Sequence, residues 1–405
     1  MEKKLDEILK SYVVTQANTE VRNKLLAAGF VVVDRNGVVY TDTAGRLDFD
    51  PSSPAYGPDS ISWLASMSKL ATAVGLLLLV ERGIIGLDDD IRGTLPELAA
   101  LQVLRGFDDD GKPTLEAHGR TITLRHLLSH TLGMGVDMAD PDLIRWAKYT
   151  RRSTNYMSYT LEGITTPLKF APGEGWYYGT AYDWAGYLLT KLTASSLSAY
   201  LQDNVFGPLG MESTTFRPSK SEKERMLAFA YAQTDEKGGI VLNPGPSPIP
   251  DEIAFEAGGS GLFSSLADYG RLLHGILAHK ILSPETTDLL FASQLNDAQK
   301  DILMAIAAYA RDGGFTPELP RDAPLDHGLG GVLNVEDVPG KRRKGSMMWS
   351  GATNGRWWID RESGLAGAVF TQVEPHGNKI LVNMFDELER TVYEARRVEK
   401  ENSLA

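Results

Sequence analysis

A serine and a lysine three positions apart stand at the head of a long apolar run in this chain of 405 residues. Ser66 and Lys69 occur in the stretch Ser-Met-Ser-Lys, directly before the run from Leu70 to Val80. Residues three apart lie on one face of a helix, so their side chains can meet. A partly desolvated lysine can take the proton of a serine hydroxyl and make it a nucleophile. The spacing indicates nucleophilic catalysis, although a capped helix with a surface lysine would show the same pattern.

Tyrosines behind a Pro-Gly turn are further candidates for proton transfer. Pro172-Gly173 is followed by Tyr177 and Tyr178, and then by a helical pattern from Asp183 to Leu192. A nearby cation favours the ionised form of a tyrosine, which could take the proton from Ser66 and later return it to a leaving group. The residues alone leave this role and simple aromatic packing open.

Two predicted hairpins supply strands near the two ends of the chain. β-Branched runs flank Asn36-Gly37, which is a strong hairpin signal. A second pair of runs, 356–360 and 365–371, flanks a turn that contains Gly364. The charged N-terminal segment and residues 379–400 read as helices. Both chain ends should therefore contribute to one antiparallel sheet flanked by helices.

The middle of the chain is predicted to be mostly helical. Pro and Gly interrupt its helical patterns, and residues 234–251 are so rich in both that we expect a long loop there. We expect residues 1–95 and 325–405 to form an α/β (α+β) sheet lobe. Residues 96–324 should form a mainly helical lobe, with loops that cover the active-site cleft. A cleft between two lobes is a usual place for a small-molecule site.

The composition excludes several classes of protein. The net charge of −12 argues against nucleic acid or an anionic membrane as a partner. The absence of cysteine excludes disulfides, thiolate zinc sites and a cysteine nucleophile. The N-terminal segment has no apolar signal core, and no apolar stretch is long enough to span a bilayer. We therefore expect a cytoplasmic location.

Six ordered motifs resemble those of a known family. They are Ser66-x-x-Lys69, Thr123 to Gly133, Pro172-Gly173 followed by Tyr178, Gly258 to Ser264, Gly328 to Gly331, and Trp349-Ser350-Gly351. In order and spacing they resemble the serine β-lactamase-like esterases and acyltransferases, which are related to class C β-lactamases and family VIII esterases. The resemblance covers nearly the whole chain and implies a β-lactamase/transpeptidase-like fold.

The resemblance also implies roles for individual residues. Ser66 would be the nucleophile, and Lys69 and Tyr178 would act together as its base, since Tyr178 rather than Tyr177 lies at the family's distance from the Pro-Gly turn. The backbone N–H groups of Ser66 and Ala352 would form the oxyanion hole. The residues implied to contact the substrate are Trp349, Ser350, Gly351 and Gly259.

Two departures from the family pattern bear on the substrate. β-Lactamases carry Lys-Thr-Gly where this chain has Trp349-Ser350-Gly351, and an asparagine where it has Thr180. Those missing groups bind the carboxylate and amide of a β-lactam. Their absence puts β-lactam hydrolysis in doubt and favours neutral esters or thioesters. Trp349 would instead offer an apolar wall, or would be an ordinary strand aromatic.

Within the family, three stretches look most like fungal acyltransferases of polyketide biosynthesis: 104–109, 178–186 and 342–346. Such enzymes move a short acyl group from a polyketide synthase thioester to a secondary alcohol. The resemblance therefore implies an acyl-Ser66 intermediate, an ester or thioester donor and an alcohol acceptor. A carboxylesterase is the alternative; an amidase, a β-lactamase or an inactive scaffold fits the pattern less well.

Other chemistry-bearing patterns are weaker. His126 and His130 have a spacing that could suit a metal, but no third ligand of suitable spacing follows, so we expect no metal and no cofactor. The basic run Lys341 to Lys344 reads as a solvated turn. It could alternatively receive an acidic acyl-carrier domain through complementary charge.

Overall fold

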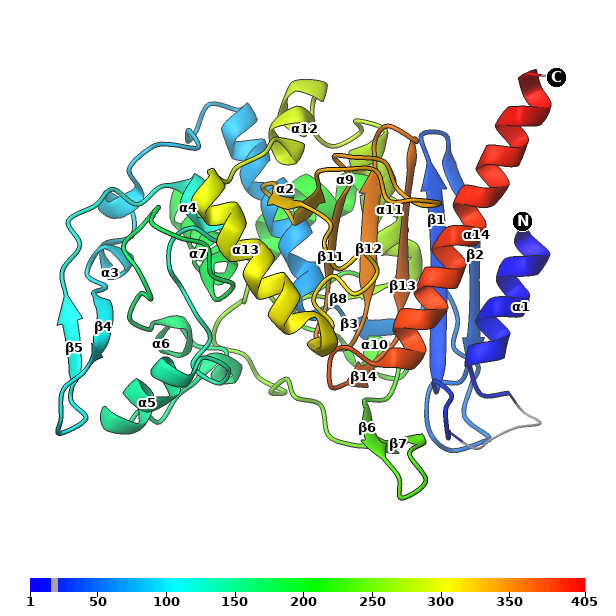
Figure 1. Cartoon of the computed structure of the whole chain (residues 1–405), viewed down its shortest axis with the longest axis horizontal. Coiled ribbons are helices and arrows are strands. Elements are labelled where there is room, and N and C mark those ends of the chain that lie inside the picture. Colours follow the sequence, from blue (N-terminus) through cyan, green and yellow to red (C-terminus); the bar gives the residue numbers. More distant parts are fainter. Residues whose placement is uncertain (16–20, 405) are drawn as a thin grey trace.

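The computed structural model describes residues 1–15 and 21–404. Its central element is a seven-stranded antiparallel sheet in the order β2-β1-β13-β12-β11-β10-β9 (Figure 1). The strands are β1 (Ala27–Asp34), β2 (Gly37–Gly45), β9 (Leu325–His327), β10 (Val332–Asn334), β11 (Met347–Ser350), β12 (Arg356–Asp360) and β13 (Leu365–Phe370). Both ends of the chain thus build one sheet, as the sequence predicts.

Both predicted hairpins of this sheet are confirmed. Asp34 pairs with Gly37 across the Asn-Gly turn, and Asp360 pairs with Leu365 across the turn that contains Gly364. Every residue of β12 and β13 is buried, which requires cover on both faces of the sheet.

Helices from different parts of the chain cover the two faces of the sheet (Figure 1). On one face lies α14 (Lys379–Leu404), whose Phe385 packs edge-on against Trp358; α1 (Glu2–Tyr12) packs beside α14. On the other face lies α11 (Leu266–Leu277), whose Tyr269 packs against Phe370 of β13. The predicted terminal helices are therefore confirmed, and the division of the chain at 95/96 and 324/325 stays a proposal.

The apolar run behind Ser66 forms α2 (Ser68–Glu81), which is buried from Ser68 to Leu79. A helix that is apolar on all sides is stable only inside a protein. It ends at Glu81, and Gly83 follows with a φ of +67°, a backbone conformation that glycine adopts easily. The first turn of this central helix is the part that faces the proposed site.

The other α-helices lie between Pro96 and Ala310 in the chain. They are α3 (Pro96–Ala99), α4 (Leu124–Leu128), α5 (Pro141–Tyr149), α6 (Leu161–Ile164), α7 (Ala181–Thr193), α8 (Leu197–Leu201), α9 (Gly207–Leu209), α10 (Lys220–Lys223), α12 (Pro284–Phe291) and α13 (Asp297–Ala310). In the described part of the chain, no helix is long and apolar enough to cross a membrane.

Three small sheets complete the fold, and one of them corrects a prediction. β3 (Ile61–Trp63) pairs with β8 (Phe263–Ser265), and β4 (Val103–Phe107) pairs with β5 (Pro113–Glu116). The third sheet joins β14 (Val373–Glu374), β6 (Ala230–Thr234) and β7 (Ile240–Pro244).

The long loop predicted over residues 234–251 is therefore wrong for its first half. Strands β6 and β7 pair from Thr234↔Ile240 to Ala230↔Pro244, with a turn between them. The carboxylate of Asp235 accepts hydrogen bonds from the N–H groups of Lys237 and Gly239, which closes that turn. Gly238 and Gly239 belong to this turn, whereas Gly245, Pro246, Pro248 and Pro250 come after β7.

Candidate active site

Ser66 lies in a short 3₁₀ turn (Ala65–Met67) between β3 and α2. Ala65 has a φ of +46°, an uncommon conformation for a residue with a Cβ atom, and such strain is concentrated at functional sites. Ala65 and Met67 are buried, whereas Ser66 is half-buried. The turn therefore leaves Ser66 partly exposed and anchors the residues on either side of it.

Lys69 lies one helical turn further on and points at the Ser66 hydroxyl. Its side chain is 3% exposed, and its Nζ donates to Ser66 Oγ at 3.2 Å and to the carbonyl oxygen of Gly259 at 2.8 Å. The same nitrogen lies 4.8 Å from the centre of the Tyr178 ring. A primary amine is thus held inside the protein, between the candidate nucleophile and a tyrosine.

Tyr178 is the tyrosine that the structure brings to Ser66. Its Oη lies 2.5 Å from Ser66 Oγ. The hydroxyl of Tyr177 instead donates to Asp140 at 2.6 Å, and burial followed by that carboxylate raises the pKa of Tyr177. The Tyr182 hydroxyl is buried against backbone carbonyls. Ser66, Lys69 and Tyr178 therefore form one contiguous hydrogen-bonded set.

The turn after β11 approaches the Ser66 turn closely at Gly351. A Cβ atom at this position would collide with the carbonyl oxygen of Leu64, so only glycine permits the contact. Thr353 donates to the carbonyl oxygen of Trp63 at 3.3 Å, which fixes the same approach from the other side. Ala352, between these anchors, is exposed.

Aromatic side chains form a wall next to Tyr178. Trp349, which is 6% exposed, has its ring 5.2 Å from that of Tyr178, and Phe315 packs edge-on against Trp349 at 5.6 Å. Ser350, at the end of the same strand, has its Oγ 3.0 Å from His376 Nε2. The structure thus brings Trp349 and Ser350 to the site together with Phe315 and His376, which the sequence analysis missed.

Gly259 is held between Lys69 and Asp183. It is buried, its carbonyl oxygen accepts from Lys69, and its N–H donates to Asp183 at 2.8 Å. Both backbone groups therefore have partners within the protein. Gly259 holds the lysine, and its contact with a substrate stays a prediction.

Two buried histidines stand behind the aromatic wall. His130 and His327 are each 1% exposed, and their rings lie 5.5 Å apart, with His130 4.9 Å from Tyr178. Burial lowers the pKa of His327 to about 4 and that of His130 well below its usual value, so both are neutral near pH 7.

His126, the other histidine of the possible metal pair, forms the N-terminal cap of α4 together with Thr123. In the described part of the chain, no group of His, Asp or Glu side chains could hold a metal.

The basic run Lys341 to Lys344 is not a solvated turn as a whole. Lys341 and Arg342 are buried, and both pair with the buried carboxylate of Glu389 on α14, at 3.1 and 2.7 Å. Arg343 and Lys344 are exposed. Half of the charge proposed to attract an acidic carrier domain is therefore inside the protein, and the other half, on Arg343 and Lys344, is exposed.

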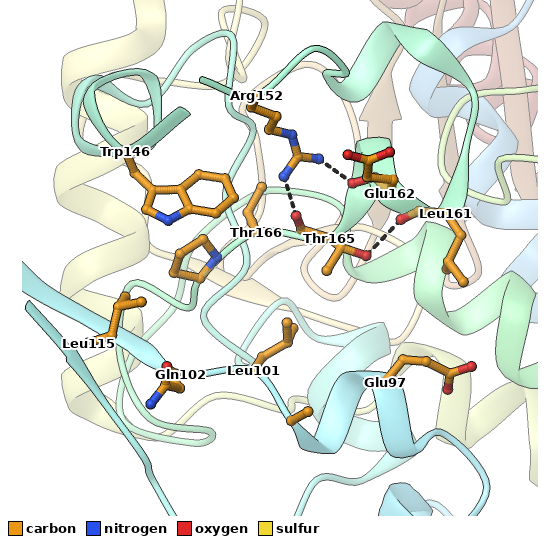
Figure 2. Close-up of a pocket in the computed structure, with 12 residues that line it drawn as sticks. Glu97, Leu101, Gln102, Leu115, Trp146, Arg152, Leu161, Glu162, Thr165 and Thr166 are labelled. Atoms are coloured by element: carbon orange, nitrogen blue, oxygen red, sulfur yellow. Dashed lines mark hydrogen bonds between the residues drawn. The ribbon is translucent and has the colours of Figure 1, made fainter. Parts of the chain in front are cut away.

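A separate pocket of about 550 Å³ lies in the helical part of the molecule (Figure 2). Trp146 and Leu115 stand on one side of it and Leu161 on the other, while Arg152 donates to the carbonyl oxygens of Glu162 and Thr165 at its edge. None of the residues that line it belongs to the hydrogen-bonded set around Ser66.

Comparisons with known proteins agree with this geometry. A family model described as Beta-lactamase matches residues 6–386. The chain is 33% identical to a lovastatin esterase of Penicillium rubens, over 76% of this chain and 78% of that protein. It is also 33% identical to a monacolin J acid methylbutanoyltransferase of Aspergillus terreus, over 86% of this chain and 85% of that protein.

A solved structure shares the fold. A mutant of simvastatin synthase from Aspergillus terreus superposes with a TM-score of 0.87 at 30% identity, over 97% of this chain and 94% of that chain. The antiparallel sheet with flanking helices is therefore the β-lactamase/transpeptidase-like fold that the sequence predicts.

Proposed function

The chain belongs to the Beta-lactamase family, and we propose that it carries a short acyl group from an ester or thioester donor to an alcohol acceptor. It is an acyltransferase or ester hydrolase, as its relatives named for both activities indicate. One observation carries the proposal: Ser66 Oγ lies within 2.5 Å of Tyr178 Oη and 3.2 Å of Lys69 Nζ. A hydroxyl that contacts two proton-transfer groups is an activated nucleophile.

In the first half of the proposed reaction, Ser66 Oγ attacks the acyl carbonyl carbon. Its proton passes to the pair of Tyr178 and Lys69, whose atoms already contact the hydroxyl. When the tetrahedral intermediate collapses, the carbon–sulfur or carbon–oxygen bond of the donor breaks. The proton then leaves on the departing thiol or alcohol, and the acyl group stays on Ser66.

The negative charge of the tetrahedral intermediate needs hydrogen-bond donors. We assign this role to the N–H groups of Ser66 and Ala352, because Gly351 lets the two segments approach each other closely. Each donor of this kind contributes on the order of 10²–10³ to the rate.

In the second half, an alcohol attacks the acyl-enzyme and takes the acyl group. The pair of Tyr178 and Lys69 removes the alcohol proton and returns it to Ser66 Oγ, which restores the enzyme. The aromatic wall of Trp349 and Phe315 favours an apolar acyl group or acceptor and limits the entry of water. We propose that the acceptor belongs to polyketide or related secondary metabolism, supported by the methylbutanoyltransferase relative.

Hydrolysis of short-chain esters is the second candidate function. Water replaces the alcohol in the same mechanism, and one relative of equal identity is named an esterase. The balance depends on how well the cleft excludes water and positions an acceptor.

β-Lactam hydrolysis has little support from the site. The position of the family lysine is taken by Trp349, which is buried against other aromatic rings. The position of the family asparagine is taken by Thr180, which is 1% exposed and donates to the carbonyl oxygen of Ile164. Neither side chain can bind the carboxylate or amide of a β-lactam in these positions.

The acyl donor could be presented on an acyl-carrier domain, since a carrier thioester has the required chemistry. This partner is a proposal, and within the run Lys341 to Lys344 only Arg343 and Lys344 are exposed to it. A cytoplasmic location likewise stays a prediction from the sequence.

The function is tested by incubating the protein with a short-chain acyl thioester and a panel of secondary alcohols, and separating the acylated alcohol from the free acid. We expect ester formation to exceed hydrolysis for at least one apolar alcohol, with both products lost in Ser66→Ala. Free acid as the sole product with every alcohol would make the protein an esterase. Thioester consumption that persists in Ser66→Ala would contradict the mechanism.

A further inference from the structure

A buried carboxylate lies directly behind Lys69, beyond the residues that can touch a substrate. Asp183, on α7, is 0% exposed, and its Oδ1 accepts the N–H of Gly259 at 2.8 Å. The carbonyl oxygen of the same glycine accepts from Lys69 Nζ at 2.8 Å. One residue of main chain therefore connects the acid to the amine.

Glycine is required at position 259 for this connection. A Cβ atom there would lie 2.9 Å from both carboxylate oxygens of Asp183, which is closer than real Cβ contacts. The absent side chain lets the carboxylate approach the main chain that holds Lys69. The motif Gly258 to Ser264 is not used in the proposed reaction steps. Its role is to hold Lys69 and Asp183 close to the same stretch of main chain.

The charge of Asp183 is balanced by Lys69, because the other groups around the carboxylate are neutral. Tyr156 and Tyr159 face the carboxylate, and burial raises the pKa of both phenols, so they stay neutral. Burial raises the pKa of Asp183 to about 6, while the charge of Lys69 opposes that rise. Asp183 is therefore largely ionised near pH 7, and an ionised carboxylate in the interior is costly unless a cation compensates it.

Asp183 is the carboxylate whose charge acts on Lys69. The other groups that face the amine are the rings of Tyr178 and Tyr182 and, within the same buried cluster, His130. The low pKa of His130, caused by burial, keeps that imidazole neutral. A buried ammonium requires the same compensation as a buried carboxylate, so the two charges stabilise each other.

We propose that Asp183 is a positioning residue that keeps Lys69 in its ammonium form and fixed on Ser66 Oγ. Lys69 then supplies positive charge beside Tyr178, which favours the phenolate form of that residue, and the phenolate oxygen takes the Ser66 proton and becomes a neutral phenol. This inference rests on the proposed function and deepens it, since it divides the work between the two members of the base.

The substitution Asp183→Asn removes the charge and keeps an oxygen that can accept the Gly259 N–H. A lysine without its counter-charge loses its proton more readily, so the pH profile of kcat/KM should shift to lower pH by at least about one unit. The limb caused by protonation of Asp183 near pH 6 should disappear as well. A profile of unchanged position and reduced height would contradict the proposal, because a purely structural role would lower activity at all pH values.

A matched control is Asp268→Asn on α11. This carboxylate is also buried, accepts the N–H of Ser213 and pairs with Arg271, and so it tests the loss of a buried charge away from Lys69. Its pH profile should stay at the wild-type position. A shift equal to that of Asp183→Asn would overturn the assignment to Asp183.

A double-mutant cycle gives a readout that is independent of activity. The unfolding equilibrium in urea is measured for wild type, Asp183→Asn, Lys69→Met and the double variant. We expect the double variant to be more stable than the sum of the single changes predicts, by at least about tenfold in the folding equilibrium constant. Additive effects would overturn the charge pair. Failure of wild type to form an acyl-Ser66 would instead overturn the proposed function and leave this cycle as the test of the pair.

Discussion

The hydroxyl oxygens of Ser66 and Tyr178, 112 positions apart in the chain, lie 2.5 Å from each other. One hydroxyl donates to the other, so a proton can pass between them without a change of structure. The neighbouring Tyr177 points away and donates to Asp140. The contact therefore favours the same tyrosine as the family spacing behind the Pro-Gly turn.

Tyr178→Phe should lower kcat/KM for a short-chain ester by roughly 10²–10⁴, because the proton acceptor is lost while the ring still packs against Trp349. Tyr177→Phe is the matched control and should keep activity within a few-fold of wild type. Ester hydrolysis rates and thermal melting of both variants check this prediction. Greater loss of activity in Tyr177→Phe would show that the assignment is shifted by one residue.

Gly351→Ala should abolish most acylation, because the new methyl group collides with the carbonyl oxygen of Leu64 and moves the Ala352 N–H away from Ser66. We expect a loss of at least about 10² in the rate of acylation, the contribution of one oxyanion donor. The control is Gly93→Ala, where no atom lies within 4 Å of the added Cβ atom. Equal acylation rates for the two variants would contradict our oxyanion assignment.

Glu389→Gln should destabilise the protein by roughly 3–5 kcal/mol, because it leaves Lys341 and Arg342 buried without their shared carboxylate. Arg343→Ala should change stability by less than about 0.5 kcal/mol, since Arg343 is exposed and its ion pairs are at the surface. Denaturant unfolding measures both. Similar losses of unfolding free energy in the two variants would mean that the buried ion pairs contribute no more to stability than the exposed ones.

Acid should destabilise the fold between about pH 6.5 and pH 4. Burial lowers the pKa values of His327 and His376 to about 4, so the unfolded chain binds more protons than the folded one in this window. Stability therefore rises with pH through the window, by up to about 1.4 kcal/mol per pH unit for each fully buried histidine. Asp183, whose pKa is raised to about 6, acts in the opposite direction.

Urea unfolding at a series of pH values measures this slope. His327→Gln should flatten it, whereas the exposed control His279→Gln should leave it unchanged. A wild-type stability that does not fall between pH 6.5 and pH 4 would contradict the burial of neutral histidines.

Local signals in the sequence predicted the elements that carry the site. The apolar run behind Ser66 and the Asn36-Gly37 turn depend on neighbours within a few residues, and both are present. The fold class followed from strands at both ends of the chain, combined with the family resemblance.

Long-range contacts were beyond the reach of the sequence. Lys341 and Arg342 read as surface residues because their partner, Glu389, lies on α14, more than forty positions away. Asp183 gave no signal within its helical pattern, and its meaning comes from Gly259, which is 76 positions distant. Such pairings depend on which segments the fold brings together, and no local pattern encodes them.

The most direct test of the central claim is intact-mass spectrometry of wild type and Ser66→Ala after brief mixing with a short-chain acyl thioester. We predict one added acyl mass on wild type, none on the variant, and loss of the adduct when an acceptor alcohol is added. An adduct of equal amount on Ser66→Ala would contradict the assignment of Ser66 as nucleophile. The absence of both adduct and thioester consumption across several acyl chains would contradict acyl transfer itself and support an inactive scaffold.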